Sequence, residues 1–383
     1  MPILKSNPFQ YGSVLKPSQL VNRKEELRET ERAMTTQGRL FLLGPRRHGK
    51  TAVLNAATRT AEAAGATVLF VDAEGCADMG DLAQTLVKLA AKLLKGELAR
   101  AGEVLLHAFA RLRPAFSYDP ATGEWSATIE GAARKEAIPT FIETLEGIAK
   151  LAQTQKRPVA VVLDEFQRVI EWGGEAAEAQ VRAAVQRHNN LGFVFAGSRT
   201  TLINDMTLNP APPFYRLGER LMLGPLPREE FRPYLTRGFE KAGFKVSPQG
   251  VEAILDLACD VPYNVQALAY HAWYLMQDSE VPLLDEAVVT KALELLVAHD
   301  QAFYLTLWNS LTKVQHNVLR AAVTEGGRQL TSVHVQTKYG VQASTVLKTL
   351  RFLEERQILR RQEEGRTTLW LPEDPFFAAW IQR

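Results

Sequence analysis

Residues 44–51, Gly-Pro-Arg-Arg-His-Gly-Lys-Thr, carry the first side chains in this sequence that could do chemistry. The spacing Gly-x-x-x-x-Gly-Lys-Thr is typical of a phosphate-binding loop, and it lies where such a loop must, between an apolar run at residues 40–43 and a helical pattern. Its two glycines permit backbone angles that let successive N–H groups point at phosphate oxygens. Lys50 can reach the β- and γ-phosphates of a nucleotide, and the Thr51 hydroxyl can ligate the accompanying Mg²⁺. The residues predicted to bind the nucleotide are Gly44, Pro45, Arg46, Arg47, His48, Gly49, Lys50, Thr51 and Ala52.

Two adjacent carboxylates, Asp164 and Glu165, form the second such group. They follow an apolar run at residues 159–163, which fits a strand buried on both faces of a parallel sheet. Because ligands bind at the carboxyl ends of such strands, we expect the pair to lie near the phosphate loop. Asp164 is predicted to hold Mg²⁺ together with Thr51. Glu165 is predicted to act as the general base on an attacking water.

Ser198 follows another apolar run, at residues 192–197. At the end of a parallel strand its side chain would lie between the two carboxylates and the γ-phosphate. We therefore predict that Ser198 senses the γ-phosphate through a hydrogen bond.

Transfer of a γ-phosphoryl group spreads negative charge that Lys50 and Mg²⁺ neutralise only in part, so an additional arginine is expected. Arg216 comes just before the last apolar run of this part of the chain, at residues 221–223. We predict that Arg216 acts on the site of a neighbouring copy of the chain. Arg199 is the second candidate, and a purely structural ion pair is the third interpretation.

The elements that must position these residues alternate between strands and helices from residue 37 to residue 225. This alternation predicts an α/β fold with a parallel sheet covered by helices on both faces. A helix is expected from Asn22 to about residue 36, because Asn22 and Glu25 have the spacing of a capping box. Residues 95–135 are expected to be an insertion that contains a β-hairpin between residues 116 and 130. We expect the aromatic residues of the N-terminal segment, Phe9 and Tyr11, to pack onto this first domain.

The pattern of apolar residues in the C-terminal part of the sequence predicts two largely helical units. Residues 228–242, 247–260 and 261–277 have the pattern of three helices that would form a lid on the sheet. Helices at residues 312–324, 330–339 and 344–355, followed by a hairpin between residues 358 and 371, predict a winged helix-turn-helix. The domains are therefore expected at residues 1–226, 227–303 and 304–383.

The third helix of the predicted winged helix carries the residues expected to contact DNA. With Val346, Leu350 and Leu353 facing inward, the residues predicted to face outward and to bind DNA are Thr345, Lys348, Thr349 and Arg351. Glu354, Glu355, Glu363 and Glu364 dilute this basic patch. Docking of a protein, or autoinhibition, is therefore an open alternative for this domain.

The order of these motifs resembles that of the archaeal-type ATPases of the STAND branch of the AAA+ class. The motifs that carry the resemblance are NPFxYG from residue 7, VNRKEEL from 21, GPRRHGKT from 44, VVLDEF from 161, FAGS from 195, and FYR from 214 followed by LGPL from 223. The resemblance implies binding of ATP with Mg²⁺, a conformational cycle and self-association. It matches residues 44–51 to the phosphate loop, Asp164 and Glu165 to the acidic pair, and Ser198 to the sensor. Where the more distantly similar archaeal replication initiators carry an arginine in the lid, this chain has Val-Pro-Tyr-Asn-Val-Gln at residues 261–266. This stretch resembles a GxPxxxQ element with Asp260 in place of the glycine.

Composition narrows the choice of function. The chain has 383 residues, 46% of them hydrophobic and 23% charged, and a formal net charge of +2. Such a near-neutral balance means that a surface for nucleic acid must be local. The two cysteines show no metal-binding spacing, and the absence of a signal peptide or membrane-length apolar run leads us to expect a cytoplasmic protein without a membrane partner.

Two functions are consistent with all of these residues. The first is an ATP-hydrolysing switch or remodelling enzyme that acts near DNA through its winged helix. The second is a signalling or scaffold protein in which the bound nucleotide controls binding to a protein partner. Both use ATP and Mg²⁺, and both allow assembly into a homo-oligomer.

Overall fold

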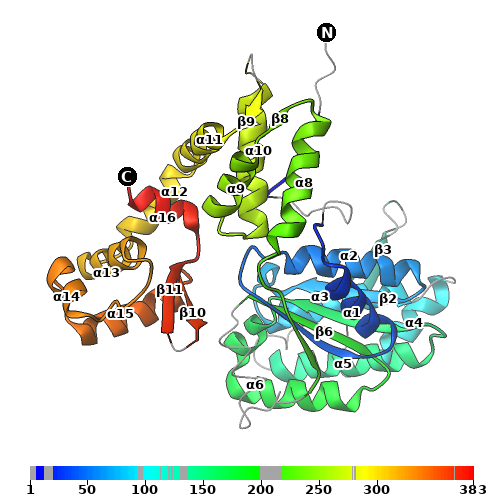
Figure 1. Cartoon of the computed structure of the whole chain (residues 1–383). Coiled ribbons are helices and arrows are strands. Elements are labelled where there is room, and N and C mark those ends of the chain that lie inside the picture. The colour runs from blue at the N-terminus through cyan, green and yellow to red at the C-terminus, as the bar shows by residue number, and fades with distance from the viewer. Residues whose placement is uncertain are drawn as a thin grey trace. The chain divides into compact units, whose positions relative to one another are not determined.

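The computed structural model describes residues 6–12, 20–93, 98–112, 114–119, 121, 124–129, 137–198, 217–277, 279, 282–365 and 367–383. The chain forms two compact units. One comprises Val14–Gly224, and the other comprises Met1–Ser13 together with Pro225–Arg383. Their secondary structure is shown in Figure 1.

The unit Val14–Gly224 is built on a five-stranded sheet in the order β2-β5-β6-β1-β7, with every neighbouring pair parallel. Its strands are β1 (Arg39–Leu43), β2 (Thr67–Asp72), β5 (Val159–Asp164), β6 (Gly192–Gly197) and β7 (Glu219–Met222). In register, Leu43 lies opposite Gly197 and Asp72 opposite Asp164. The carboxyl ends of these strands therefore bring residues 44, 164 and 198 to one edge of the sheet.

Helices cover both faces of this sheet (Figure 1), as predicted. They are α1 (Lys24–Thr35), α2 (Lys50–Ala63), α3 (Met79–Ala90), α4 (Leu98–Ala108), α5 (Ala137–Gln153) and α6 (Gln167–Arg187), with short 3₁₀ turns at Ala73–Gly75 and Ala91–Leu93. Successive strand residues alternate between two hydrophobic clusters. Val161 and Leu163 pack with α3, α5 and α6, whereas Ala160 and Val162 pack with α1 and α2. This alternation explains why β5 reads as a continuous apolar run.

Of two local predictions for this unit, the hairpin is present and the capping box is not. The predicted hairpin is confirmed, since β3 (Pro114–Asp119) pairs antiparallel with β4 (Glu124–Ile129). The predicted capping box at Asn22 is wrong. The residue at the helix N-terminus is Arg23, no side chain caps the helix, and Asn22 has a φ of 30°. The side chain of Arg23 instead donates hydrogen bonds to the carbonyl oxygens of His48 and Gly224.

In the second unit, the three helices predicted between residues 228 and 277 are present as α8 (Arg228–Lys241), α9 (Pro248–Leu257) and α10 (Pro262–Gln277). The pattern of apolar residues did not predict the short parallel pair β8 (Lys245–Val246) and β9 (Leu283–Leu284). The helices α11 (Glu286–His299) and α12 (Gln301–Asn309) follow.

The prediction that the N-terminal aromatic residues pack onto the first domain is wrong. Phe9 is fully buried against Phe239 of α8, at a centroid separation of 4.6 Å, and Tyr11 bonds to His271 of α10 at 2.8 Å. Gly238 allows this close approach, because a Cβ placed there would lie 2.5 Å from the Phe9 ring. The N-terminal segment is therefore part of the second unit.

The winged helix comprises α13 (Lys313–Thr324), α14 (Val333–Tyr339), α15 (Ala343–Glu355) and the antiparallel hairpin of β10 (Leu359–Glu364) and β11 (Thr367–Pro372). A capping box between Thr312 and Gln315 begins α13. The last helix, α16 (Pro375–Ile381), packs Phe377 onto Tyr304 of α12 at a centroid separation of 5.3 Å. None of the helices in the described part of the chain has the length and hydrophobicity that crossing a bilayer requires.

Candidate functional site

The phosphate loop runs from the end of β1 into α2. Gly44 has a φ of 156°, and a Cβ at this position would lie 2.5 Å from the carbonyl oxygen of Leu223, so only glycine fits against the next strand. Gly49 has a φ of 89° and begins α2 without a side-chain cap. The N-terminus of α2 therefore faces the loop with the positive end of its dipole, as binding of an anion requires.

Lys50 lies inside the loop rather than in solvent. Its side chain is 5% exposed, and Nζ donates to the carbonyl oxygens of Gly44 at 2.9 Å and of Pro45 at 3.0 Å. The loop thus positions the ammonium group within its own curve, which is where the phosphates of a nucleotide would be bound.

Thr51 and Asp164 lie together, as the two motifs predict. Thr51 Oγ1 donates to Asp164 Oδ2 at 2.7 Å, and the backbone N–H of Glu165 donates to Asp164 Oδ1 at 3.0 Å. Asp164 is 1% exposed, and burial raises its pKa, while the hydrogen bond from Thr51 lowers it in part. A hydroxyl and a carboxylate are oxygen ligands of the kind that Mg²⁺ prefers, so these two residues fit the predicted metal site.

Glu165 follows β5 in an unusual backbone conformation, with a φ of 50°. Its Oε2 accepts a hydrogen bond from Ser198 Oγ at 2.6 Å and a second one from Gln167 Nε2. The structure therefore brings Ser198 to the acidic pair, where the sequence placed it. Sequence reasoning missed Gln167, although its position two residues after Glu165 in a tight turn was a usable signal.

Arg23 is a second residue that sequence reasoning missed. It is 6% exposed, and its Nη2 donates to the carbonyl oxygen of Gly224 at 2.6 Å and to that of His48 at 3.5 Å. Its Nη1 forms an ion pair with Glu26 at 2.8 Å. Arg23 thus ties the phosphate loop to the segment that follows β7.

The arginine of the loop and the two arginines proposed for catalysis are placed as follows. Arg46 is 47% exposed and lies 3.7 Å from a carboxylate oxygen of Glu74. Arg199 and Arg216 lie outside the described residues.

The predicted DNA-contacting residues on α15 do not all face outward. Lys348 and Arg351 are exposed and Thr345 is half-buried, but Thr349 is 7% exposed. The prediction that Thr349 faces outward is therefore wrong. Thr349 lies three positions after Val346 and four before Leu353, so the helical period places it on the same inward face.

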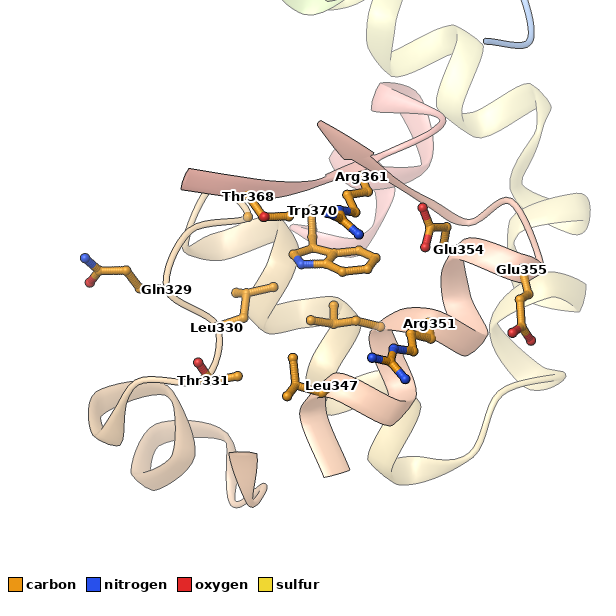
Figure 2. Close-up of a pocket in the computed structure, with 12 residues that line it drawn as sticks. Gln329, Leu330, Thr331, Leu347, Arg351, Glu354, Glu355, Arg361, Thr368 and Trp370 are labelled. Carbon is orange, nitrogen blue, oxygen red and sulfur yellow. The ribbon is translucent and has the colours of Figure 1, made fainter. Parts of the chain in front are cut away.

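A groove of about 590 Å³ separates α15 from the wing strands. Its floor is apolar and includes Leu330, Leu350 and Trp370. Figure 2 shows Trp370 beside Leu330, with Leu347 and Arg351 of α15 on the facing wall. The groove also carries Glu354, whose pKa is raised by burial and lowered in part by Arg361, together with Glu355. Arginines and glutamates thus balance each other along the groove.

Comparison with known proteins agrees with this architecture. Residues 19–195 match the family described as the AAA ATPase domain, and residues 302–383 match the family described as a probable winged helix domain. No curated protein matches the chain at a significant level.

Three solved archaeal structures have a similar fold. A Walker-type ATPase of Pyrococcus abyssi is 17% identical with a TM-score of 0.65, over 98% of this chain and 100% of that chain. ORC2 of Aeropyrum pernix, solved as ADPNP–ADP complexes, is 15% identical with a TM-score of 0.59, over 97% of this chain and 96% of that chain. ORC1 of Aeropyrum pernix, solved in complex with DNA, is 17% identical with a TM-score of 0.53, over 99% of this chain and 97% of that chain. At sequence identities this low, the structural similarity shows a common fold alone.

Proposed function

We propose that this chain, an AAA+ ATPase with a C-terminal winged helix domain, is a Mg²⁺-dependent switch that binds ATP, hydrolyses it and acts near DNA. The observation that carries the proposal is the convergence of Thr51, Asp164, Glu165 and Ser198 beside the phosphate loop. We also propose the STAND branch for this chain, on its motifs, and a division of the second unit into a lid at 227–303 and a winged helix at 304–383.

Each of these residues has a task in this proposal. The N–H groups of the loop and Lys50 bind the phosphates, and Thr51 and Asp164 hold Mg²⁺, which neutralises charge on the β- and γ-phosphates when bound. Glu165 accepts a proton from the attacking water. Ser198 donates a hydrogen bond to Glu165, and in this proposal it senses the γ-phosphate and reports the state of the nucleotide to the base.

The test is Glu165→Gln. The amide keeps the shape of the side chain but accepts no proton, so hydrolysis should fall by about 10²–10⁴-fold while ATP remains bound. Asp164→Ala should instead remove the dependence on Mg²⁺. Glu175→Gln, the same change at an exposed position of α6, is the matched control and should hydrolyse ATP at the wild-type rate. Normal hydrolysis by Glu165→Gln would show that the base lies elsewhere.

Contact with DNA is proposed through Lys348, Arg351 and Thr345 of α15. Two of these side chains are exposed cations on the third helix of a winged helix, the element that reads the major groove in helix-turn-helix proteins. ORC1, whose fold is similar, was solved in complex with DNA. We also propose that the ATPase forms homo-oligomers.

A protein partner is the second candidate, and the groove beside α15 is the observation that favours it. An apolar floor with balanced charges is suited to a protein segment, whereas a polyanion is bound by excess positive charge. Titration of the full-length chain with duplex DNA at several salt concentrations separates the two functions. Affinity that falls steeply with salt supports contact with DNA, and the absence of binding at low salt supports the protein partner.

A further inference from the structure

Gln167 contacts the proposed general base from a buried position. It is the first residue of α6, it is 3% exposed, and its Nε2 donates to Glu165 Oε2, the same oxygen that accepts from Ser198. In the part of the chain that the structure describes, no donor forms a hydrogen bond with the other oxygen of this carboxylate, Oε1. The two oxygens of this carboxylate are therefore in different environments.

We propose that Gln167 is a positioning residue, which together with Ser198 fixes Oε2 of Glu165 so that Oε1 accepts the proton. This inference rests on the proposed ATP hydrolysis. In that step the water oxygen forms a bond to the γ-phosphorus, and the bond from the γ-phosphorus to the bridging oxygen breaks. The electron pair of the broken bond leaves with ADP, and the proton of the water goes to Oε1.

The turn that presents Gln167 is anchored to the strand that presents Ser198. The backbone N–H of Phe166 donates to the carbonyl oxygen of Ala196 at 2.8 Å, and Ser198 lies two residues after Ala196. Glu165 adopts its positive φ at the start of the same turn. The turn that presents Gln167 and the end of β6 that presents Ser198 are therefore joined by a backbone hydrogen bond next to Glu165.

The side-chain oxygen of Gln167 indicates that this residue positions Glu165 rather than only filling space in the interior. Among the described residues, Gln167 Oε1 is buried without a hydrogen-bond partner. An unpaired buried acceptor is costly, and an apolar side chain of the same size would avoid that cost. The benefit of glutamine at this position is thus its N–H donor, whose hydrogen bond within the described residues goes to Glu165.

The first test is Gln167→Met, which conserves volume and removes the donor. We expect kcat for ATP to fall by about 10- to 100-fold, the effect of a reacting group displaced by about 1 Å. The KM for ATP and the affinity for a non-hydrolysable ATP analogue should not change. Arg168→Met is the matched control, because the half-buried Arg168 side chain pairs with Glu171 and lies over the Trp172 ring, and it should keep the wild-type kcat.

The decisive measurement is the same substitution combined with Glu165→Gln, followed over single turnovers. If Gln167 acts through Glu165, adding Gln167→Met to Glu165→Gln causes no further loss, because the base is already absent. A further loss of the same size, or a wild-type kcat in the single variant, would overturn the inference. If Gln167→Met fails to bind the analogue, Gln167→Leu is judged by the same two comparisons. A wild-type chain that does not hydrolyse ATP contradicts the proposed function itself, which distinguishes that failure from this one.

Discussion

Thr51 donates a hydrogen bond to Asp164 at 2.7 Å, although 113 positions separate the two residues in the sequence. Thr51 follows β1 and Asp164 ends β5, and β6 lies between these two strands in the sheet. The contact is therefore made across the edge of the sheet rather than between neighbouring strands. It places a hydroxyl and a carboxylate together at the point where the phosphate loop begins its helix.

Replacing Asp164 with asparagine should stabilise the nucleotide-free protein at neutral pH. Burial raises the pKa of Asp164 above its ordinary value of 3.8, so the folded state binds the proton more tightly than the unfolded state. The stability that this group contributes is complete below pH 3.8 and is lost as the pH rises through the folded-state pKa. We expect Asp164→Asn to raise Tm by roughly 2–4 °C at pH 8.

The pH dependence of this gain is its diagnostic feature. Thermal unfolding with a chelator and without nucleotide should show the difference between Asp164→Asn and wild type shrinking as the pH is lowered toward 4. Glu175→Gln, at an exposed carboxylate, should show no such trend. A variant that is less stable than wild type at every pH would mean that the two hydrogen bonds to Asp164 outweigh the cost of burying its charge.

Lys50→Ala should abolish tight binding of ATP. The ammonium group is held by the carbonyl oxygens of Gly44 and Pro45, inside the loop that would bind the phosphates. Hydrogen bonds to charged groups are among the strongest, so affinity measured by calorimetry should fall by roughly 10²-fold or more. Arg59→Ala, at an exposed position of α2 outside the loop, should bind ATP almost as wild type does. Equal affinities for wild type and Lys50→Ala would refute the assignment of the phosphate loop.

Arg23→Ala should lower both stability and affinity for ATP. Arg23 joins the carbonyl oxygens of Gly224 and His48, so its loss leaves buried acceptors without their charged donor. The free energy of unfolding should fall by about 1.5–3 kcal/mol in a denaturant titration. Arg28→Ala removes a 70% exposed arginine from the same helix and should change neither quantity measurably. Unchanged ATP affinity in Arg23→Ala would show that Arg23 supports the fold without shaping the loop.

The sequence predicts the sheet and the acidic edge well because the signals are local and repeated. The run at residues 159–163 is apolar at every position because both faces of β5 are covered, and the carboxylates come directly after it. Periodicity also predicts the winged helix, but it does not decide which residues at the border of the apolar stripe are buried. Thr349 lies at that border and is buried.

The misses in the site depend on tertiary contacts. No role is predicted for Arg23, because nothing local indicates that the carbonyl oxygen of Gly224 lies beside it. Gln167 is likewise an ordinary first residue of a helix until the turn after β5 aims it at Glu165. Phe9 packs against residues more than 220 positions away, and its partner surface exists only because Gly238 has no side chain.

Reversing the charge of the exposed cations on α15 should weaken DNA binding without affecting hydrolysis measured in the absence of DNA. For Lys348→Glu with Arg351→Glu, we expect weaker binding to all sequences and a salt dependence reduced by about two phosphate contacts. Lys291→Glu with Lys313→Glu makes the same change in net charge at exposed positions outside α15 and should bind DNA as wild type does. Unchanged affinity in the α15 variant would favour the protein partner.

The last prediction concerns the charge that the site lacks. Within the described residues, Lys50 is the cation that the phosphate loop holds, and an additional arginine is worth roughly 10³–10⁵-fold in the rate of γ-phosphoryl transfer. Arg46 lies near Glu74, and we expect a different arginine to contact the γ-phosphate. We predict that Arg216 supplies this charge to a neighbouring copy, with Arg199 as the second candidate and a structural ion pair as the third interpretation.

An arginine acting between copies makes activity depend on assembly. Hydrolysis per chain should therefore rise with protein concentration, and Arg216→Ala should remove that rise while leaving affinity for ATP nearly intact. Arg199→Ala is the matched comparison. It should retain the rise if Arg216 is the residue that acts, and it should lose the rise if the second candidate is correct. Activity independent of concentration in a chain that sedimentation shows to be a monomer would end the idea, because a monomer has no neighbour to receive the charge.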